Sequence, residues 1–188
     1  EAGVPGWEAV GRPGPEDRVW RFMSFDPQKE TDLLDKAEKK RFRDVTLPDG
    51  LKDWYMPGFD DSKWNSGKAP IGKGSWKHRL IGKAEVQYNS DWGDGEFLLM
   101  RTTFKLDHLD YADYRIAVLA RQGFDIYLNG HKINTYVWWK DEPQYRPVEL
   151  TSAETKYLKK GVNVLAAYAN VEYDQRTEAP SASMDFWI

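Results

Sequence analysis

The alternation of apolar and polar side chains is clearest in the middle of the chain. Residues 124–128 place an apolar side chain at every second position, which is the period of a strand that buries one face. Asn129 and Gly130 follow directly, and β-rich sequence resumes at 133–135. A two-residue type I′ turn needs positive φ at both central positions, which Asn and Gly tolerate best. The stretch 124–136 therefore predicts a β-hairpin at the centre of the fold.

Other apolar stretches predict further strands on both sides of this hairpin. They cover residues 19–23, 42–47, 97–106, 114–120, 148–150, 162–170 and 184–188. Strands that follow one another without alternating helices predict an all-β fold, and we expect a two-sheet antiparallel β-sandwich.

Two segments show a helical pattern instead. From Thr31 to Arg41, apolar residues share one helical face and opposite charges stand four residues apart, which predicts a short N-terminal helix. Residues 151–154 read Thr-Ser-Ala-Glu, a capping-box sequence that predicts a short helical turn ended by Gly161.

Proline and glycine divide the rest of the chain. Residues 1–16 are rich in both, which predicts an irregular arm. Residues 54–74 are aromatic and glycine-rich, and a loop of this length is uncommon unless it carries function or packs on itself. We therefore divide the chain into two regions. Residues 1–50 contain the arm, a strand and the helix, and they form either a linker or part of the sandwich. Residues 51–188 form the sandwich itself.

Composition excludes several classes of function. The 188 residues suit one domain with a substantial core, and a net charge of -3 provides no overall basic field for nucleic acid. No apolar run is as long as a transmembrane helix, so we expect no membrane insertion. The absence of cysteine excludes disulfides and thiolate catalysis. Because the sequence begins at Glu1 without a signal peptide, we expect a mature or excised piece of a longer polypeptide.

The sequence offers little catalytic chemistry. His78, His108 and His131 are widely separated, have no metal-ligand spacing and are best explained as surface or edge-strand residues. No Gly-x-Ser-x-Gly elbow occurs, and thirty acidic residues supply carboxylate pairs by chance. Asp60 and Asp61 are better explained as stabilising the turn before Trp64. We predict that the chain is not an enzyme on its own.

Six short motifs, taken in order, carry a resemblance to a known family. They lie at residues 58–64, 69–72, 99–104, 126–130, 160–165 and 184–188. Their order resembles the galactose-binding-like jelly-roll module found beside catalytic domains in extracellular bacterial proteins. It is also similar to the sugar-binding β-sandwich of β-galactosidase-type glycosidases. The resemblance covers residues 54–188.

This resemblance implies a jelly-roll sandwich with a non-catalytic role, often carbohydrate binding, within a larger secreted or periplasmic enzyme. The implied partners are a polysaccharide or oligosaccharide and the adjacent domain of the parent polypeptide. Two alternatives stay open: a purely structural domain, and a domain that contributes a loop to a glycosidase active site. One departure concerns residues 121–123, which read Arg-Gln-Gly where family members often carry Asp-Asp-Gly.

Sugar recognition needs an exposed aromatic ring against the apolar face of a pyranose, with polar groups around its hydroxyl rim. Trp138 and Trp139 follow the predicted hairpin and point to opposite faces of a strand, so that at least one could be exposed. For this pair, a buried position in the core and an exposed position at the surface are equally expected. The rings of Trp76, Trp92 and Tyr173 could equally hold their loops against the sandwich. Trp64 and Trp187 match motif positions and are expected in the core. The candidate carbohydrate-binding residues are Trp76, Trp92, Trp138, Trp139, Tyr173 and Arg121.

Calcium is the one cofactor that the resemblance allows, as a structural ion. Calcium requires six to eight oxygen ligands, several of them carboxylates and backbone carbonyls. Asp91 and Asp94, within residues 90–95, are the best local candidates.

Overall fold

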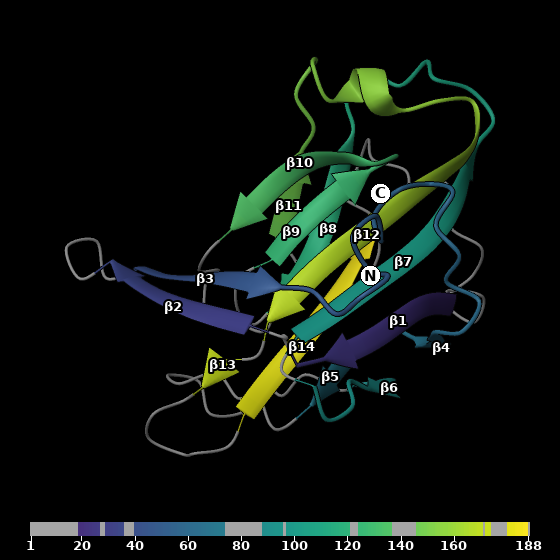
Figure 1. Ribbon diagram of the computed structural model, residues 1–188. Helices are drawn as coiled ribbons and strands as arrows, with labels where there is room; N and C mark the ends of the chain where they lie inside the picture. Colours follow the sequence, from purple (N-terminus) through teal and green to yellow (C-terminus); the bar gives the residue numbers. More distant parts are fainter. Residues whose placement is uncertain are drawn as a thin grey trace.

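The computed structural model describes residues 19–26, 29–35, 40–73, 88–95, 97–120, 124–136, 146–170, 172–173 and 180–187 (Figure 1). The strands are β1 (Val19–Phe25), β2 (Lys29–Asp35), β3 (Lys40–Thr46), β4 (Asn65–Lys68), β5 (Ile71–Lys73), β6 (Ser90–Asp91), β7 (Phe97–Leu106), β8 (Arg115–Ala120), β9 (Phe124–Leu128), β10 (His131–Tyr136), β11 (Arg146–Glu149), β12 (Gly161–Asn170), β13 (Glu172–Tyr173) and β14 (Pro180–Trp187). A short 3₁₀ helix, η2, spans Thr155–Tyr157. Among the described residues, no helix has the length and apolar character needed to cross a membrane.

The strands form two stacked sheets and one separate hairpin. The first sheet has the order β10-β9-β12-β7-β1-β4, and all of its neighbouring strands are antiparallel. The second has the order β11-β8-β14-β5-β6, in which only β5 and β6 run parallel, and β13 pairs with the start of β14. The predicted all-β sandwich is therefore confirmed.

Alternation along the strands builds the main core between the two sheets. In β9, Phe124, Ile126 and Leu128 are buried while the two residues between them are partly exposed. The same period operates in β7 and β12 of the first sheet and in β8 of the second. The core residues of these three strands are Leu98, Met100, Phe104, Leu106, Ile116, Val118, Leu165, Ala167 and Ala169.

The local predictions with a defined turn chemistry are confirmed. Asn129 and Gly130 join β9 to β10 with φ of 50° and 85°, as a type I′ turn requires. In the capping box, the Thr151 backbone N–H donates to Glu154 Oε2 at 2.7 Å, and the Glu154 N–H donates to Thr151 Oγ1 at 3.3 Å. Gly161, with φ of 92°, follows η2 and begins β12.

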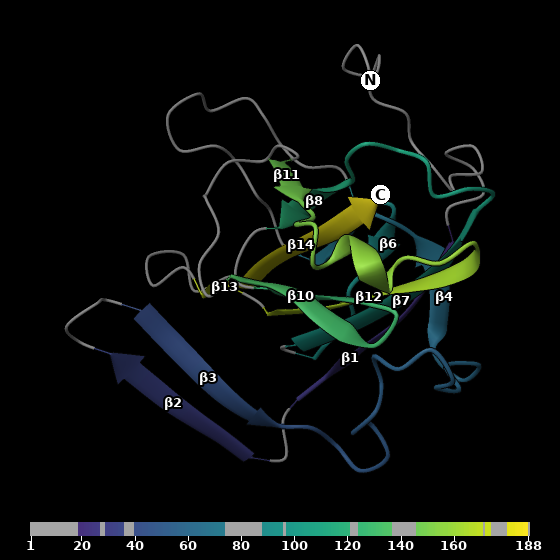
Figure 2. The same cartoon turned by 90° about the horizontal axis from the view of Figure 1, so that it is seen from above.

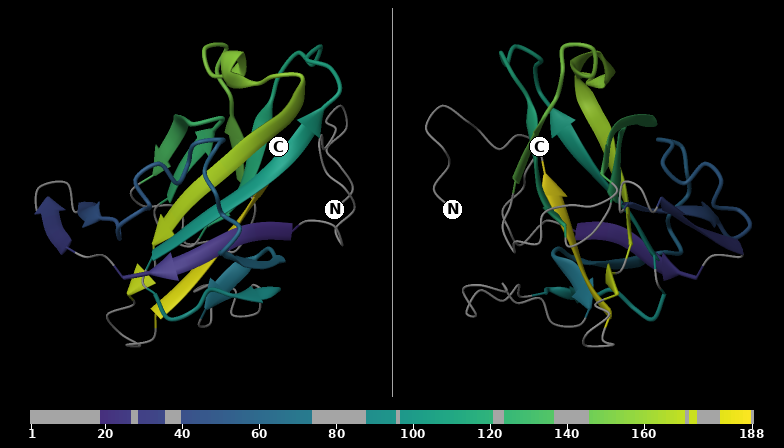
Figure 3. Two further views of the ribbon diagram at one scale, coloured as in Figure 1. Left: turned by 45° about the vertical axis from the view of Figure 1, so that its right-hand side comes forward. Right: turned by 90° about the vertical axis from the view of Figure 1, so that its left-hand side faces the viewer.

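The predicted helix from Thr31 to Arg41 is wrong. β2 and β3 occupy most of that range and form an antiparallel hairpin, which stands outside the two stacked sheets (Figures 2 and 3). Their register sets Asp32 opposite Arg43 and Leu33 opposite Phe42. Asp32 and Asp35, which could pair along a helix face, here stand opposite Arg43 and Lys40, and opposite charges across a strand pair are also favourable.

Part of the first fifty residues belongs to the sandwich. β1 lies between β7 and β4 in the first sheet, and Trp20 and Phe22 reach the main core. Residues 1–18, which include the expected irregular arm, lie outside the described residues.

The outer face of the first sheet is covered by the chain itself. Residues 47–64, hereafter the cover segment, lie on the side of this sheet opposite to the second sheet (Figure 3, right). A second apolar cluster fills the space between cover segment and sheet. Its buried members are Phe25, Leu51, Trp54, Phe97, Leu99 and Ala166, and Met23, Leu47, Tyr55, Phe59, Trp64, Tyr127 and Tyr168 pack against them.

The cover segment is a chain of tight turns. Backbone N–H groups of Trp54, Met56 and Phe59 each donate to the carbonyl three residues earlier, at 3.0–3.2 Å. Asp60 accepts from the Ser62 N–H at 3.0 Å, and hydrogen bonds from the Ser62 side chain and backbone hold the pKa of Asp60 below its ordinary value. The prediction of one irregular loop over 54–74 is wrong in its second half, where β4 and β5 form, and the first half packs on the sheet. The turn-stabilising role is confirmed for Asp60, whereas the Asp61 carboxylate binds Arg101.

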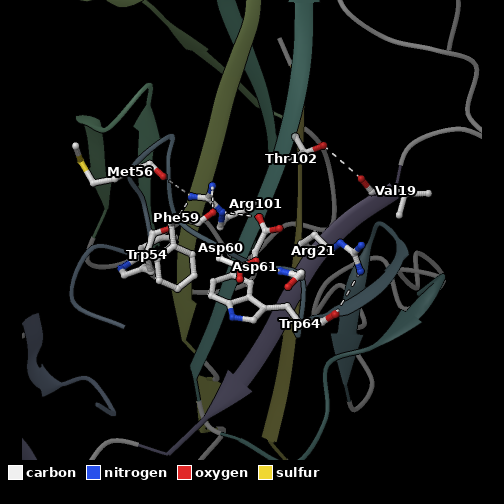
Figure 4. A network of polar contacts seen from close by, with 11 residues as sticks. Val19, Arg21, Trp54, Met56, Phe59, Asp60, Asp61, Trp64, Arg101 and Thr102 are labelled. Carbon is white, nitrogen blue, oxygen red and sulfur yellow. Dashed lines mark hydrogen bonds and ion pairs between the residues drawn. The ribbon is translucent and has the colours of Figure 1, made fainter. Parts of the chain in front are cut away.

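Arg101, on the outer face of β7, joins the cover segment to the sheet (Figure 4). Its side chain is only 4% exposed, and Nε donates to Asp61 Oδ2 at 2.7 Å. Nη1 donates to the carbonyls of Trp54 and Met56 at 2.5 and 3.0 Å, and Nη2 donates to the carbonyl of Phe59 at 3.5 Å. One guanidinium therefore fixes four positions of the segment.

Loss of Arg101 should loosen the cover segment. Arg101→Met keeps most of the buried volume but leaves three carbonyls and the Asp61 carboxylate without their donor, so we expect a loss of about 3 kcal/mol of unfolding free energy. Urea denaturation measures this change. Arg21→Met is a matched control, because Arg21 stands opposite Arg101 on β1 but makes, among the described residues, a single exposed 3.5 Å bond to the Trp64 carbonyl. The control should lose less than about 0.5 kcal/mol, and equal losses in the two variants would contradict this role for Arg101.

Candidate functional site

The strand register divides the sandwich into two ends. At one, the loop end, β1, β5, β8, β10 and β12 end while β7, β9 and β14 begin. At the other, the turn end, lie the Asn129–Gly130 turn, the start of β12 and the end of β7. Figure 1 shows the arrowheads of β10 and β12 and the tail of β9 on the same side of the molecule.

All the candidate residues predicted from the sequence belong to segments that leave strands at the loop end. Trp76 follows Lys73, the last residue of β5; Arg121 follows β8; and Trp138 and Trp139 follow β10. These four residues lie outside the described residues. Tyr173 is placed by its backbone alone, as the end of β13 opposite Pro180.

Trp92 does not fit a sugar-stacking role. Its side chain is 1% exposed and belongs to the main core, so neither face of the ring can meet a ligand. The indole Nε1 donates to the Gly95 carbonyl at 3.0 Å, and the Trp92 backbone N–H donates to the Gly72 carbonyl at 2.9 Å. The prediction of Trp92 as a carbohydrate-binding residue is therefore wrong, and the open alternative of a loop-pinning ring holds for it.

The segment around Trp92 is held close to β1. The Gly95 N–H donates to Ser24 Oγ at 3.2 Å. A Cβ on Gly95 would lie 2.3 Å from the backbone nitrogen of Phe25, so only glycine fits this approach of two backbones. The loop between β6 and β7 is thus a fixed part of the sandwich.

The residues proposed for calcium have other hydrogen-bond partners in this structure. Lys73 Nζ donates to the carbonyls of Asp94 and Gly95, both at 3.1 Å, so an ammonium group already stands where a cation would meet these oxygens. Asp91 Oδ1 accepts from the Gly93 N–H at 2.6 Å and closes a turn. Nowhere in the described part of the chain do three or more His, Cys, Asp or Glu side chains gather as metal ligands.

A group of rings on β9 and the cover segment was missed by sequence reasoning. Tyr55 stacks on Tyr127 with centroids 4.5 Å apart, and Trp54 meets Tyr127 edge-on at 5.3 Å. Lys132 lies beside them, with Nζ 3.0 Å from Asp125 Oδ2 and 5.4 Å from the centre of the Tyr127 ring. The polar positions of the 124–128 alternation indicate an outer face there, but they do not show that another segment covers it.

Burial and charge shift two pKa values in this group. Burial and the neighbouring Asp125 carboxylate raise the pKa of Tyr127 above its ordinary value, against the opposing effect of Lys132. Burial lowers the pKa of Lys132, but the hydrogen bond and charge of Asp125 outweigh it and raise the pKa overall. At neutral pH the Tyr127 phenol is therefore neutral and the Lys132 amine is charged.

The turn end carries a second feature that the sequence did not reveal. His131 stacks on Tyr157, with centroids 3.9 Å apart and ring planes at 6°. Both side chains are exposed, which agrees with the expectation of His131 as an edge-strand residue. His108 is also exposed, whereas His78 lies outside the described residues. Tyr157 lies in η2, and no sequence pattern connects it with His131.

No family model and no curated protein matches the chain. Several solved structures are similar to it in part. Three are a glycosyl hydrolase family 2 member from Bacteroides cellulosilyticus (16% identity, TM-score 0.46), a beta-glycosidase from Bacteroides vulgatus (15%, 0.48) and a beta-glucuronidase from glycoside hydrolase family 2 (17%, 0.46). The matches cover 90%, 96% and 86% of this chain but only 20%, 20% and 14% of those chains. The chain thus spans a fifth or less of the length of these three.

The contact of Lys73 with two carbonyls leads to a prediction about calcium. Because an ammonium group already satisfies these oxygens, millimolar calcium and excess chelator should give the same melting temperature, measured by differential scanning fluorimetry. Lys73→Met should lower the stability by about 1 kcal/mol, since it leaves two carbonyls with a lost charge-assisted donor. A clear rise in the wild-type melting temperature on adding calcium would restore Asp91 and Asp94 as metal ligands.

Proposed function

We propose that this chain is a non-catalytic, carbohydrate-binding accessory domain of a larger glycoside hydrolase. In this proposal the domain is of the galactose-binding-like type, is secreted or periplasmic in a bacterium, and recognises a polysaccharide or oligosaccharide through aromatic loop residues. Its second partner is the adjacent domain of the parent polypeptide.

One observation carries the proposal: the loops that contain the candidate rings start from a single end of the sandwich. β10 ends at Tyr136 opposite Phe124, the first residue of β9, and β8 ends at Ala120 opposite Met184 of β14. β5 ends at Lys73 opposite Ala182, close to the start of the same strand. Segments that begin within one strand-end region are well placed to form one binding surface.

The side-chain types in these loops suit a sugar. Trp138, Trp139 and Trp76 offer flat apolar rings for the C–H face of a pyranose, and Arg121 offers five donors for hydroxyl or carboxylate oxygens. Tyr173 combines a ring with a hydroxyl group.

The six motifs that gave the resemblance lie on strands and turns of the sandwich and on the segment that covers it. They fall in the cover segment, at the start of β5, in β7, across the β9–β10 turn, at the start of β12 and in β14.

A second candidate function is purely structural support of a neighbouring catalytic domain. The observation that favours it is the use of aromatic side chains as internal packing. Trp20, Trp54 and Trp92 are 2%, 3% and 1% exposed, and none of these three is free to meet a ligand. A third role, in which a loop completes a neighbouring glycosidase active site, would use the same loop end.

Substitution of the Trp pair separates these functions. Trp138→Ala and Trp139→Ala, singly and together, should weaken retention on polysaccharide affinity gels by about tenfold, because a stacked ring contributes on the order of 1.4 kcal/mol. Their melting temperatures should stay close to that of the wild type.

Trp92→Ala serves as the matched control for a structural ring. It removes a buried indole, so it should lower the melting temperature strongly. A Trp138 or Trp139 variant that behaves like this control, with unchanged glycan retention, would support the structural function instead. Normal glycan retention by these variants together with lost turnover of the full-length enzyme would support the active-site role.

A further inference from the structure

The turn end of the sandwich presents an exposed stack of two aromatic rings that the proposed loop-end site does not use. His131 begins β10, and Tyr157 ends η2. The ring centroids are 3.9 Å apart and the planes are nearly parallel, at 6°. Because stacking uses one face of each ring, the exposed area of the pair lies on its outer faces and edges.

Hydrogen bonds hold the segments that carry the pair. Asn129 Nδ2 donates to the Tyr157 carbonyl at 2.7 Å and to Asn163 Oδ1 at 2.8 Å. Asn129 Oδ1 accepts from the Val164 N–H at 2.8 Å, while the Asn129 N–H donates to the Val164 carbonyl at 2.9 Å. The hairpin turn, η2 and β12 are thereby joined at one residue.

Asn163 completes this support beneath the surface. Its side chain is 0% exposed, and Nδ2 donates to the carbonyls of Lys159 and Gly161 at 2.7 and 3.0 Å. Oδ1 also accepts from the Lys159 N–H at 3.0 Å. A buried amide with all its bonds satisfied makes a rigid base, so the two rings keep their positions without a ligand.

The apolar surface extends beyond the two rings. Met56, 42% exposed, lies over the turn next to His131: a Cβ on Gly130 would be 2.9 Å from Met56 Sδ and 3.3 Å from Pro57 Cδ. The cover segment, the hairpin turn and η2 thus meet here. An exposed apolar side chain of the cover segment therefore lies close to the turn that precedes His131.

Two exposed lysines stand next to Tyr157 in the chain. Lys156 precedes it and Lys159 follows two residues later. Lys132, which follows His131, instead binds Asp125 on the other face of β10. A ring surface and nearby ammonium donors suit a pyranose, which presents a C–H face and a border of acceptor oxygens.

We propose that the His131–Tyr157 ring pair is a second carbohydrate subsite, at the end of the sandwich opposite the proposed loop-end site. It binds a pyranose by stacking, and the lysines donate to its hydroxyl or carboxylate oxygens. This inference rests on the proposed carbohydrate-binding function but assigns a different surface to it. A domain with both subsites can hold two chains, or two stretches of one chain, which raises retention on a polymer through multivalency.

The test compares ring variants with and without the loop-end site. Affinity gel electrophoresis on neutral and uronate-containing polysaccharides would use Tyr157→Ala, Tyr157→Phe and His131→Ala, each in the wild type and in the Trp138→Ala/Trp139→Ala background. Tyr157→Ala should weaken retention about tenfold and remove what remains in that background. Tyr157→Phe should bind like the wild type because it keeps the ring. Val19→Ala is the matched control: Val19 is 49% exposed, and β1 is separated from β9 by β12 and β7.

Several results would overturn the second subsite. Wild-type retention by Tyr157→Ala would do so. Loss of all retention in the Trp138→Ala/Trp139→Ala variant alone would also overturn the second subsite, but it would leave the proposed carbohydrate-binding function standing. Loss on Lys156→Gln/Lys159→Gln with no effect of Tyr157→Ala would show charge attraction instead of stacking. NMR of the His131 ring during titration with an oligosaccharide detects weak binding directly. A saturable shift that survives the Trp pair substitutions supports a subsite that is independent of the loop end, and the absence of any shift in the wild type would overturn it.

Discussion

The contact of Arg101 with the cover segment is the interaction on which the outer layer of this domain depends. A guanidinium in the middle of a sheet is costly to remove from water unless its donors are satisfied. Here the cover segment supplies one carboxylate and three carbonyls to it. The segment in turn has little regular hydrogen bonding of its own beyond its tight turns. The cover segment therefore satisfies the donors of the guanidinium, and Arg101 satisfies the carboxylate and carbonyls of the segment. Without this contact, both sets of polar groups would be buried and unpaired.

This contact decides which surfaces are free. Leu99 and Ala166, which face outward from β7 and β12, are fully buried because the cover segment closes over them. The first sheet thus has a core on both of its faces, and its flat outer side is not an open platform. The proposed ligand contacts therefore fall at the two ends of the sandwich. At the loop end lie the ends of the strands that precede the candidate Trp residues, and at the turn end the His131–Tyr157 stack is exposed.

The parts of this structure that sequence predicts well are the local ones. The 124–136 hairpin and the capping box at Thr151 depend on residues within a few positions of one another, and both are confirmed. The helix predicted at 31–41 failed because charges four residues apart are also compatible with a hairpin, where Asp32 stands opposite Arg43 and Asp35 opposite Lys40. The role of Arg101 could have been suspected from a charge that directly follows the apolar run 97–100. Its partners, however, lie 40 or more residues away in the chain.

The candidate site was predictable to a similar degree. Sequence identified aromatic residues in loops, but exposure is a property of the packed molecule, so sequence could not show that Trp92 is buried. The stack of His131 on Tyr157 joins residues 26 positions apart through a turn and a 3₁₀ helix, so no periodic pattern indicates it.

The central claim is that carbohydrate meets this domain at its ends and not on the closed outer face of the first sheet. An NMR titration of the isotope-labelled domain with an oligosaccharide tests it most directly. The account predicts saturable shifts in backbone amides at the strand ends, such as Phe124 and the Asn129–His131 turn, with Leu99 and Ala166 unchanged. Shifts centred on Leu99, Ala166 and the cover segment would contradict it, because they would show that the cover segment opens and the sheet face itself binds the sugar.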